Sequence, residues 1–288
     1  MGYRSCLAEG LLDGRTIIVT GGGSGLGRCT AHELASLGAH VVITGRRADK
    51  LEAVQGEIRE DGGRCETRAF DIREEDAVRA AVREIAGAHG RIDALVNNAG
   101  GQFMSDLEAI SAKGFDTVLR TNLSGGFLMM REVFDVSMKA HGGAIVNITA
   151  DQLGGMPGMG HSGAARAGME NLTKTAAWEW GPYGVRVNCV APGWIHSSGL
   201  DTYPEDQKAR ILSYGEGAPL KRLGAEWEVS AAIAFLVGPA ASYITGTTLR
   251  VDGGGSLGAP HVTYPLRDAG VGNAMPENRF HRSADPRG

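Results

Sequence analysis

The 288-residue chain has few cysteines, few aromatic residues and little net charge. Its four cysteines are scattered without metal-ligand spacing, so we expect free thiols in a reducing compartment and no metal site. A net charge of −4 provides no basic field of the kind that binds nucleic acid. The 44 glycines follow no fixed period, which excludes a collagen-like chain.

Long hydrophobic runs are also absent. No stretch of about 18 apolar residues occurs, so we expect no membrane-spanning helix. The first ten residues lack the apolar core of a secretory signal, and the final Pro-Arg-Gly is not a peroxisomal address. We therefore expect a cytoplasmic protein.

Strand and helix patterns alternate along most of the chain. This alternation predicts one α/β domain, with a seven-stranded parallel sheet and helices on both faces. The 42% of hydrophobic residues are sufficient for a large core. We expect strands at 16–20, 40–44, near 69–71, and at 92–96, 144–148, 185–190 and 247–251.

Helices are expected between these strands. Asp49 is expected to cap one of them, and others are predicted at 107–120, 123–140, 163–180 and 229–237. An irregular stretch at 193–220, which contains Tyr203 and Tyr214, is expected to cover a site as a lid. The residues after Gly255 are rich in Gly and Pro and are expected to form a tail.

A glycine-rich turn follows the first strand, in the sequence Thr20-Gly21-Gly22-Gly23-Ser24-Gly25-Leu26-Gly27. A strand that enters a helix through bare glycines lets a pyrophosphate approach the backbone N–H groups and the positive end of the helix. Its place at the first strand–helix junction therefore predicts a dinucleotide site.

Six stretches resemble the short-chain dehydrogenase/reductase family in order and spacing. They are TGGGSGLG at 20–27, NNAG at 97–100, Asn122 within TNLSGGF, IVNIT at 145–149, APG at 191–193 and VDGG at 251–254. The resemblance implies a Rossmann-fold domain over residues 12–255 and a tail over 256–288. NNAGGQF at 97–103 and HSGAARAG at 161–168 are more narrowly similar to the peroxisomal-type trans-2-enoyl-CoA reductase branch, with the dienoyl-CoA reductases as neighbours.

The second strand ends at Gly45 and is followed by Arg46 and Arg47. An NAD-binding relative would carry an acidic residue near here to accept the ribose hydroxyls. A guanidinium group instead pairs well with a phosphate, so the two arginines favour NADP(H) with its 2′-phosphate. The alternative is a solvated charge pair at the start of a helix.

The resemblance implies further cofactor contacts. Asp71 occupies the position that contacts the adenine amino group, and Asn98 the one that holds the ribose side of the sheet edge. The expected cofactor-binding residues are Gly21, Ser24, Gly25, Leu26, Gly27, Arg46, Arg47, Asp71, Ile72, Asn98, Ala99, Gly100, Arg166, Pro192, Gly193 and Ile195.

The chain departs from the family at its acid/base residues. Most members use Ser, Tyr and Lys, with Tyr and Lys four residues apart just before an Ala-Gly pair. Counting back from that pair gives Arg166 in the lysine place and Ser162 in the tyrosine place, and Thr149 falls in the serine place. Arginine does not readily lose a proton and serine is a weak acid, so the usual oxidation of an alcohol is disfavoured.

Reduction of an enoyl thioester needs something different, namely hydrogen-bond donors around the oxygen on which negative charge develops. Thr149, Ser162 and His161 are candidate donors, although His161 is equally explained as a structural histidine at a helix start. Asn122 lies in a helix kink in the family and feeds a proton relay there. The candidate catalytic set is Asn122, Thr149, Ser162 and Arg166.

The leading hypothesis is an NADPH-dependent enoyl-CoA reductase whose substrate is an acyl-CoA. Two alternatives stay open: a 3-hydroxyacyl or terpenoid alcohol dehydrogenase with an unusual acid/base set, and a non-catalytic NADP-binding sensor or assembly protein. Helices 107–140 and 163–180 carry apolar residues on more than one face, and this pattern predicts a homo-tetramer.

Overall fold

Seven parallel strands form the central sheet of the computed structural model, which describes residues 3–152, 154–197 and 204–257. Their order across the sheet is β3-β2-β1-β4-β5-β6-β9. The predicted seven-stranded parallel sheet is therefore confirmed. The strands are β1 (Thr16–Thr20), β2 (His40–Gly45), β3 (Arg64–Ala69), β4 (Ala94–Asn97), β5 (Gly143–Ile148), β6 (Val185–Pro192) and β9 (Thr248–Val251).

The strand order reverses at β1, which lies between β2 and β4. In an open parallel sheet, loops leave the carboxyl ends of the strands in opposite directions at such a point and create a crevice for a ligand. All five residues of β1 are buried, as expected for a central strand covered on both faces. The fold thus places the glycine-rich turn at the natural ligand site of this architecture.

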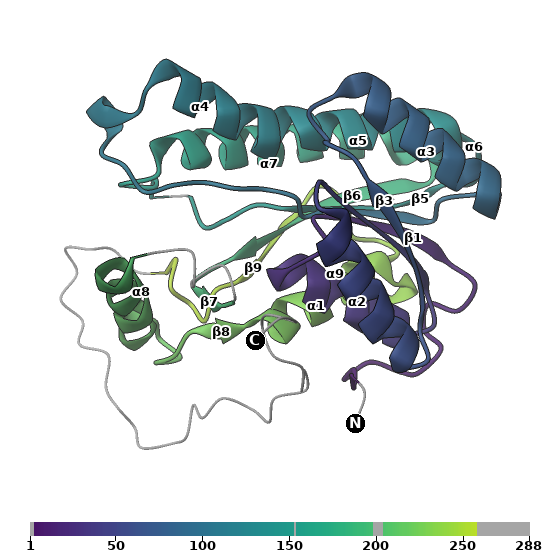
Figure 1. The fold of residues 1–288 in the computed structure, drawn as a ribbon, viewed down its shortest axis with the longest axis horizontal. Coiled ribbons are helices and arrows are strands. Elements are labelled where there is room, and N and C mark those ends of the chain that lie inside the picture. The colour runs from purple at the N-terminus through teal and green to yellow at the C-terminus, as the bar shows by residue number, and fades with distance from the viewer. Residues whose placement is uncertain (1–2, 153, 198–203, 258–288) are drawn as a thin grey trace.

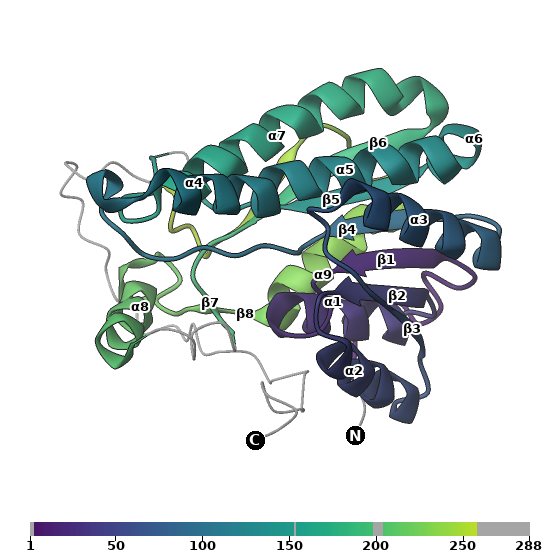
Figure 2. The same cartoon turned by 45° about the horizontal axis from the view of Figure 1, so that its top comes forward.

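Helices cover both faces of the sheet (Figures 1 and 2). Side chains alternate along each strand, so Ile17 and Val19 join the core beneath one helix layer and Ile18 joins the core beneath the other. None of the helices in the described part of the chain is long and apolar enough to cross a membrane. One layer contains α1 (Gly25–Ser36), α2 (Ala48–Glu60) and α9 (Glu226–Val237), and the other contains α3 (Glu75–His89), α4 (Ala112–Leu119), α5 (Gly125–Val133) and α7 (Gly160–Trp180).

The helical region after β4 differs from the two helices expected at 107–120 and 123–140. A π-helical turn, η2 (Arg120–Ser124), joins α4 directly to α5, and a second one, η3 (Phe134–Met138), leads into α6 (Lys139–His141). Leu107–Ala109 forms a separate 3₁₀ turn. A π-turn inserts an extra residue into a helix and commonly marks a functional position. Here it contains Asn122, which is buried.

Residues 193–220, expected to be irregular, contain helix α8 (Glu205–Gly217). Pro204 precedes two acidic residues at its start, which is a helix-start signal that the sequence did carry. Two short strands, β7 (Ile195–His196) and β8 (Gly224–Ala225), pair as a second small sheet. Helix α8 lies to one side of the two helix layers, and β8 leads from it directly into α9 (Figure 2).

Three further boundaries bear on the sequence expectations. Arg47, and not Asp49, is the N-cap residue of α2, so Asp49 lies inside the first helical turn. Helix α7 begins at Gly160, before the expected start at 163. Tyr203 and residues 258–288 of the expected tail lie outside the described residues.

Candidate active site

Several positions of the glycine-rich turn accept only glycine. Gly21 has a φ of +69°, in the left-handed region that glycine tolerates. A Cβ on Gly27 would lie 2.3 Å from the carbonyl oxygen of Gly21 and 2.4 Å from Nδ2 of Asn98. A Cβ on Gly22 would lie 2.6 Å from Cβ of Ile43. The backbone is therefore bare where the first helix begins.

Helix α1 presents its N-terminus at this turn. Its N-cap residue, Ser24, makes no side-chain capping hydrogen bond, and there is no acidic residue in the first turn. The first N–H groups of a helix have no partners within the helix and carry a partial positive charge. Both the amides and the Ser24 hydroxyl can therefore contact an anion, as the sequence predicted for a pyrophosphate.

Asn98 fastens this turn to the neighbouring strand. Its side-chain Nδ2 donates to the carbonyl oxygen of Thr20 at 2.9 Å, and its backbone N–H donates to the Thr20 hydroxyl at 3.0 Å. The backbone N–H of Ala99 donates to the same hydroxyl, also at 3.0 Å. These bonds hold the end of β4 against the end of β1, so the two sides of the crevice are fixed relative to each other.

The two arginines after β2 have different environments. Arg47 forms an exposed ion pair with Asp49, with Nη2 and Oδ2 2.6 Å apart, and this hydrogen bonding raises the pKa of Arg47. Arg46 is exposed and makes no hydrogen bond or ion pair with the residues described. Among this pair, Arg46 is therefore the more available to a phosphate.

Asp71 has a partner that the sequence analysis missed. Arg73 binds it with two side-chain nitrogens, Nη2 to Oδ2 at 2.5 Å and Nε to Oδ1 at 2.9 Å. These bonds, with a smaller contribution from the charge of Arg46, lower the pKa of the Asp71 carboxyl. The side chain of Ile72 is buried in the core and abuts Gly125, so only its backbone can face a cofactor. The spacing Asp-x-Arg was the signal available in the sequence.

The expected nicotinamide side lies at the end of β6. The backbone N–H of Gly193 donates to the carbonyl oxygen of Val251 at 3.0 Å, and a Cβ on Gly193 would lie 2.8 Å from Cα of Asp252. Pro192 is the last residue of β6, and Ile195 belongs to β7 with its side chain against Gly224.

Arg166 and Asn122 converge on Gly100. A Cβ on Gly100 would lie 2.8 Å from Nη2 of Arg166 and 3.0 Å from Oδ1 of Asn122. Asn122 exchanges two hydrogen bonds with the backbone of Gly101, at 2.9 and 3.0 Å. Arg166 donates from Nη1 to the carbonyl oxygen of Ile148 at 2.6 Å. The structure therefore brings three predicted site residues together from a loop, a π-turn and α7.

Burial gives Arg166 an unusual electrostatic environment. Arg166 is only 8% exposed, and this burial lowers the pKa of its guanidinium to about 10. The group still carries a positive charge at neutral pH. Its Nε is buried and has no hydrogen-bond partner among the residues described. A buried donor of this kind is costly unless a ligand satisfies it.

Ser162 contacts a residue that was not in the predicted set. Its hydroxyl donates to Oε1 of Gln102 at 3.2 Å, and both Ser162 and the adjacent His161 are fully buried. Nδ1 of His161 accepts from the backbone N–H of Ser162 at 2.8 Å, so the proton of the neutral ring is on Nε2. That Nε2 has no partner within the described ranges, and the ring of Phe103 packs edge-on at 4.3 Å. Gln102 and Phe103 belong to the NNAGGQF stretch. The sequence analysis used that stretch only for the resemblance to the enoyl-CoA reductase branch and gave these two residues no role.

Thr149 is oriented differently from the other candidates. Its hydroxyl lies 3.3 Å from the carbonyl oxygen of Val190 and 3.4 Å from Oε1 of Glu170. These contacts direct it toward β6 and the middle of α7, and its hydrogen bonds with described residues do not include Ser162 or Arg166. The described hydrogen bonds of the Thr149 hydroxyl thus lie outside the candidate set, while Arg166 bonds the carbonyl oxygen of the preceding residue, Ile148.

Comparison with known proteins decides the family. A family model described as "Enoyl-(Acyl carrier protein) reductase" matches residues 21–256. This chain belongs to the short-chain dehydrogenase/reductase family. It is 38% identical over 260 residues to a peroxisomal 2,4-dienoyl-CoA reductase of Danio rerio, covering 88% of this chain and 86% of that one. It is 37% identical over 248 residues to a probable 2,4-dienoyl-CoA reductase of Bacillus subtilis (strain 168), covering 84% and 97%.

Solved structures agree with this assignment. A citronellol catabolism dehydrogenase of Pseudomonas aeruginosa PAO1 is 60% identical to this chain, with a TM-score of 0.80. The alignment covers 88% of this chain and all of that one. As a short-chain dehydrogenase/reductase, the protein is an oxidoreductase of a family that binds NAD(P)(H). The bare turn, the free N-terminus of α1 and the unsatisfied Nε of Arg166 fit such a cofactor.

Replacing Gly27 with alanine should weaken cofactor binding by about tenfold or more, because the new Cβ must displace the Gly21 carbonyl and the Asn98 amide. Titration of cofactor fluorescence measures this. The matched control is Gly56→Ala in α2, where an added Cβ meets no atom within 4 Å. That variant should bind cofactor as the parent does. Unchanged affinity in Gly27→Ala would contradict the assignment of the turn.

Proposed function

We propose that this protein reduces the C=C bond of a trans-2-enoyl-CoA with NADPH. The observation that carries the proposal is that α7 buries two residues four positions apart: Arg166, which is positively charged at neutral pH, and Ser162, which stands where most of the family has tyrosine. The relatives named as 2,4-dienoyl-CoA reductases support an acyl-CoA substrate.

Bound NADPH would supply the hydride, which is delivered to the β-carbon of the enoyl group. The residues of this chain would then stabilise the negative charge that develops on the thioester oxygen. Candidate donors are the side-chain amide of Gln102 and Nε2 of His161, together with the Ser162 hydroxyl once it turns from Oε1 of Gln102 to the substrate. Ser162 and His161 are fully buried, whereas Gln102 is exposed, and buried donors held in place stabilise such charge because they need no reorganisation. Protonation of the α-carbon can come from water.

Alcohol oxidation makes a demand that these residues meet poorly. An alcohol must lose its hydroxyl proton as the hydride leaves, and a general base works best with a pKa near the working pH. Arg166, with a pKa of about 10, stays protonated, and a serine hydroxyl is a far weaker acid than a phenol. Positive potential and hydrogen-bond donation are the functions that remain.

One observation favours a second candidate function. The 60% identical protein of Pseudomonas aeruginosa is named a dehydrogenase of citronellol catabolism. A terpenoid alcohol or the corresponding 3-hydroxyacyl thioester is therefore the alternative substrate class. The same name recommends methyl-branched as well as straight-chain enoyl thioesters for any substrate panel.

NADPH should bind at least tenfold more tightly than NADH, equivalent to about 1.4 kcal/mol, because Arg46 can pair with the 2′-phosphate. Arg46→Ala should remove most of the difference. Arg83→Ala is the control, since this exposed side chain lies on α3 and pairs with Glu132. Titration of the parent and both variants with each cofactor gives the six affinities needed. Equal binding of NADPH and NADH by the parent protein would refute the preference.

The parent protein should reduce an enoyl-CoA with NADPH faster than it oxidises a matched 3-hydroxyacyl-CoA or secondary alcohol with NADP⁺. Ser162→Ala should lower kcat by about 10²-fold with little change in cofactor affinity. Arg166→Ala should lower kcat and NADPH affinity together. Thr175→Ala, an exposed position on the same helix, is the control.

Two results would change the assignment. Strong alcohol oxidation without enoyl reduction would favour the dehydrogenase. Activity in neither assay, with NADPH still bound, would favour the non-catalytic sensor that the missing tyrosine also permits.

We also infer a homo-tetramer, on narrower grounds than the sequence offered. Met129, Val133 and Met169, which suggested helix faces apolar all round, are buried within the subunit. Phe127 and Trp178 remain exposed at 39% and 86% on the outer helix layer. Light scattering at micromolar concentration should give four times the monomer mass, and Trp178→Lys should lower it. A monomer mass for the parent protein would exclude this assembly.

A further inference from the structure

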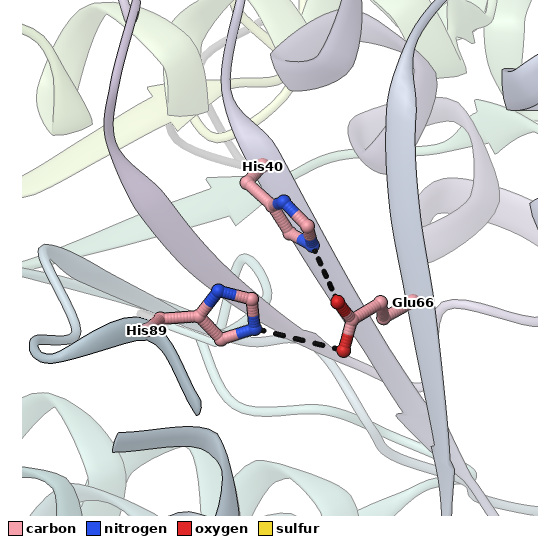
Figure 3. A group of neighbouring side chains, drawn as sticks. All are labelled: His40, Glu66 and His89. Atoms are coloured by element: carbon pink, nitrogen blue, oxygen red, sulfur yellow. Dashed lines mark ion pairs between the residues drawn. The ribbon is translucent and has the colours of Figure 1, made fainter. Parts of the chain in front are cut away.

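Three residues that are far apart in the sequence meet at one edge of the sheet, away from the glycine-rich turn. His40 begins β2, Glu66 lies in the edge strand β3, and His89 is the last residue of α3. The register pairs Val42 with Glu66, and Val42 belongs to the core beneath α3. The cluster therefore lies on the α3 face of the sheet. Figure 3 shows both imidazole rings facing the Glu66 carboxylate.

The three side chains are close enough to share one ion. Nε2 of His40 lies 3.1 Å from Oε1 of Glu66, and Nε2 of His89 lies 3.6 Å from Oε2. The two ring centroids are 4.5 Å apart, and one ligand atom from each residue can be chosen so that all lie within 4.8 Å of one another. In a tetrahedral zinc site with bonds of about 2.0–2.2 Å, ligand atoms are about 3.3 Å apart. The two nitrogen–oxygen separations already match this spacing.

The ring nitrogens also lack other partners. Nε2 of His40 and Nε2 of His89 are shielded from solvent, and among the described residues the Glu66 carboxylate is the partner that each of them contacts. Buried polar atoms of this kind are normally satisfied by protein, water or an ion. Two imidazoles and one carboxylate on a common point form a donor set typical of zinc.

We propose that His40, Glu66 and His89 bind one Zn²⁺ ion per subunit, with water completing the coordination. The ion would connect β2, the edge strand β3 and the carboxyl end of α3, and it would act on stability. Nitrogen donors make the site selective for zinc over Mg²⁺ and Ca²⁺, which prefer oxygen ligands. Because the sequence expectation of no metal site considered only the cysteines, it did not examine these residues.

Two arginines oppose a cation here: Arg64, whose charge acts on His40, and Arg68, which contacts Glu66. Nη2 of Arg68 lies 3.4 Å from Oε2 of Glu66, while its Nε lies 3.3 Å from Oε2 of Glu84. A guanidinium so close to a ligand opposes a cation, but Arg68 keeps Glu84 as a partner when Glu66 turns to the metal. The carboxylate of Glu66 can therefore be released without leaving a charge unpaired.

Isothermal titration of the metal-free full-length protein with Zn²⁺ tests the site. We expect saturable binding of one ion per subunit, a higher Tm with zinc that EDTA reverses, and no comparable effect of Mg²⁺ or Ca²⁺. His40→Ala, Glu66→Gln and His89→Ala should each weaken binding about tenfold or more. His141→Ala, an exposed histidine at the end of α6, should bind zinc as the parent does.

A second experiment locates the ion in the parent protein and therefore does not depend on the folding of any variant. Anomalous diffraction at the zinc edge, from parent crystals soaked in Zn²⁺, should place an ion within bonding distance of all three side chains. No saturable binding by the parent protein, or an ion bound only elsewhere, for example at the exposed Cys6, would overturn the proposal. NADPH binding and turnover are not involved in either measurement.

Discussion

The architecture of the site depends on the hydrogen bonds between Thr20 and Asn98. They join the carboxyl ends of β1 and β4, the two strands between which the chain reverses direction across the sheet. The loops that follow these two strands run in opposite directions. Without the Thr20–Asn98 bonds, only the backbone hydrogen bonds between β1 and β4 would hold the two sides of the crevice together. With the ends fixed, the bare turn from Gly21 to Gly27 has a rigid wall opposite it, and the amides of α1 have a constant direction.

A buried cation, Arg166, lies beside the loop that follows β4. The guanidinium of Arg166 can approach the loop after β4 because Gly100 has no side chain there. Asn122, in the π-turn, lies against the same glycine. Desolvation lowers its pKa, yet far too little for it to serve as a proton carrier near neutrality. A site that holds charge without exchanging protons is suited to reactions in which an oxygen becomes transiently negative. The hydrogen-bonded pair of Ser162 and Gln102 extends that capacity.

Backbone features were predictable from the sequence and many side-chain contacts were not. Buried β-branched runs such as Thr16–Thr20 identify strands because a doubly covered strand is apolar throughout. The helix kink at Asn122 was expected from the family resemblance, and the structure has a π-turn there; its π form has no periodic pattern of its own and was not predicted. Thr149 was placed in the family's serine position by counting, but its hydroxyl turns toward Glu170, and counting along a chain does not reveal the direction of a side chain. The role of Gln102 likewise depends on a partner sixty positions away.

The position of β3 has a consequence for how copies of this protein can associate. An outermost strand exposes unpaired backbone groups and can add a strand from another molecule, which leads to uncontrolled association. Here that strand carries charged side chains at every second position, Arg64, Glu66 and Arg68. If β3 of another copy paired with it in register, side chains of like charge would face each other, and these side chains would lose contact with water. This pattern of charges disfavours growth of the sheet on the β3 side, which leaves β9 as its other edge.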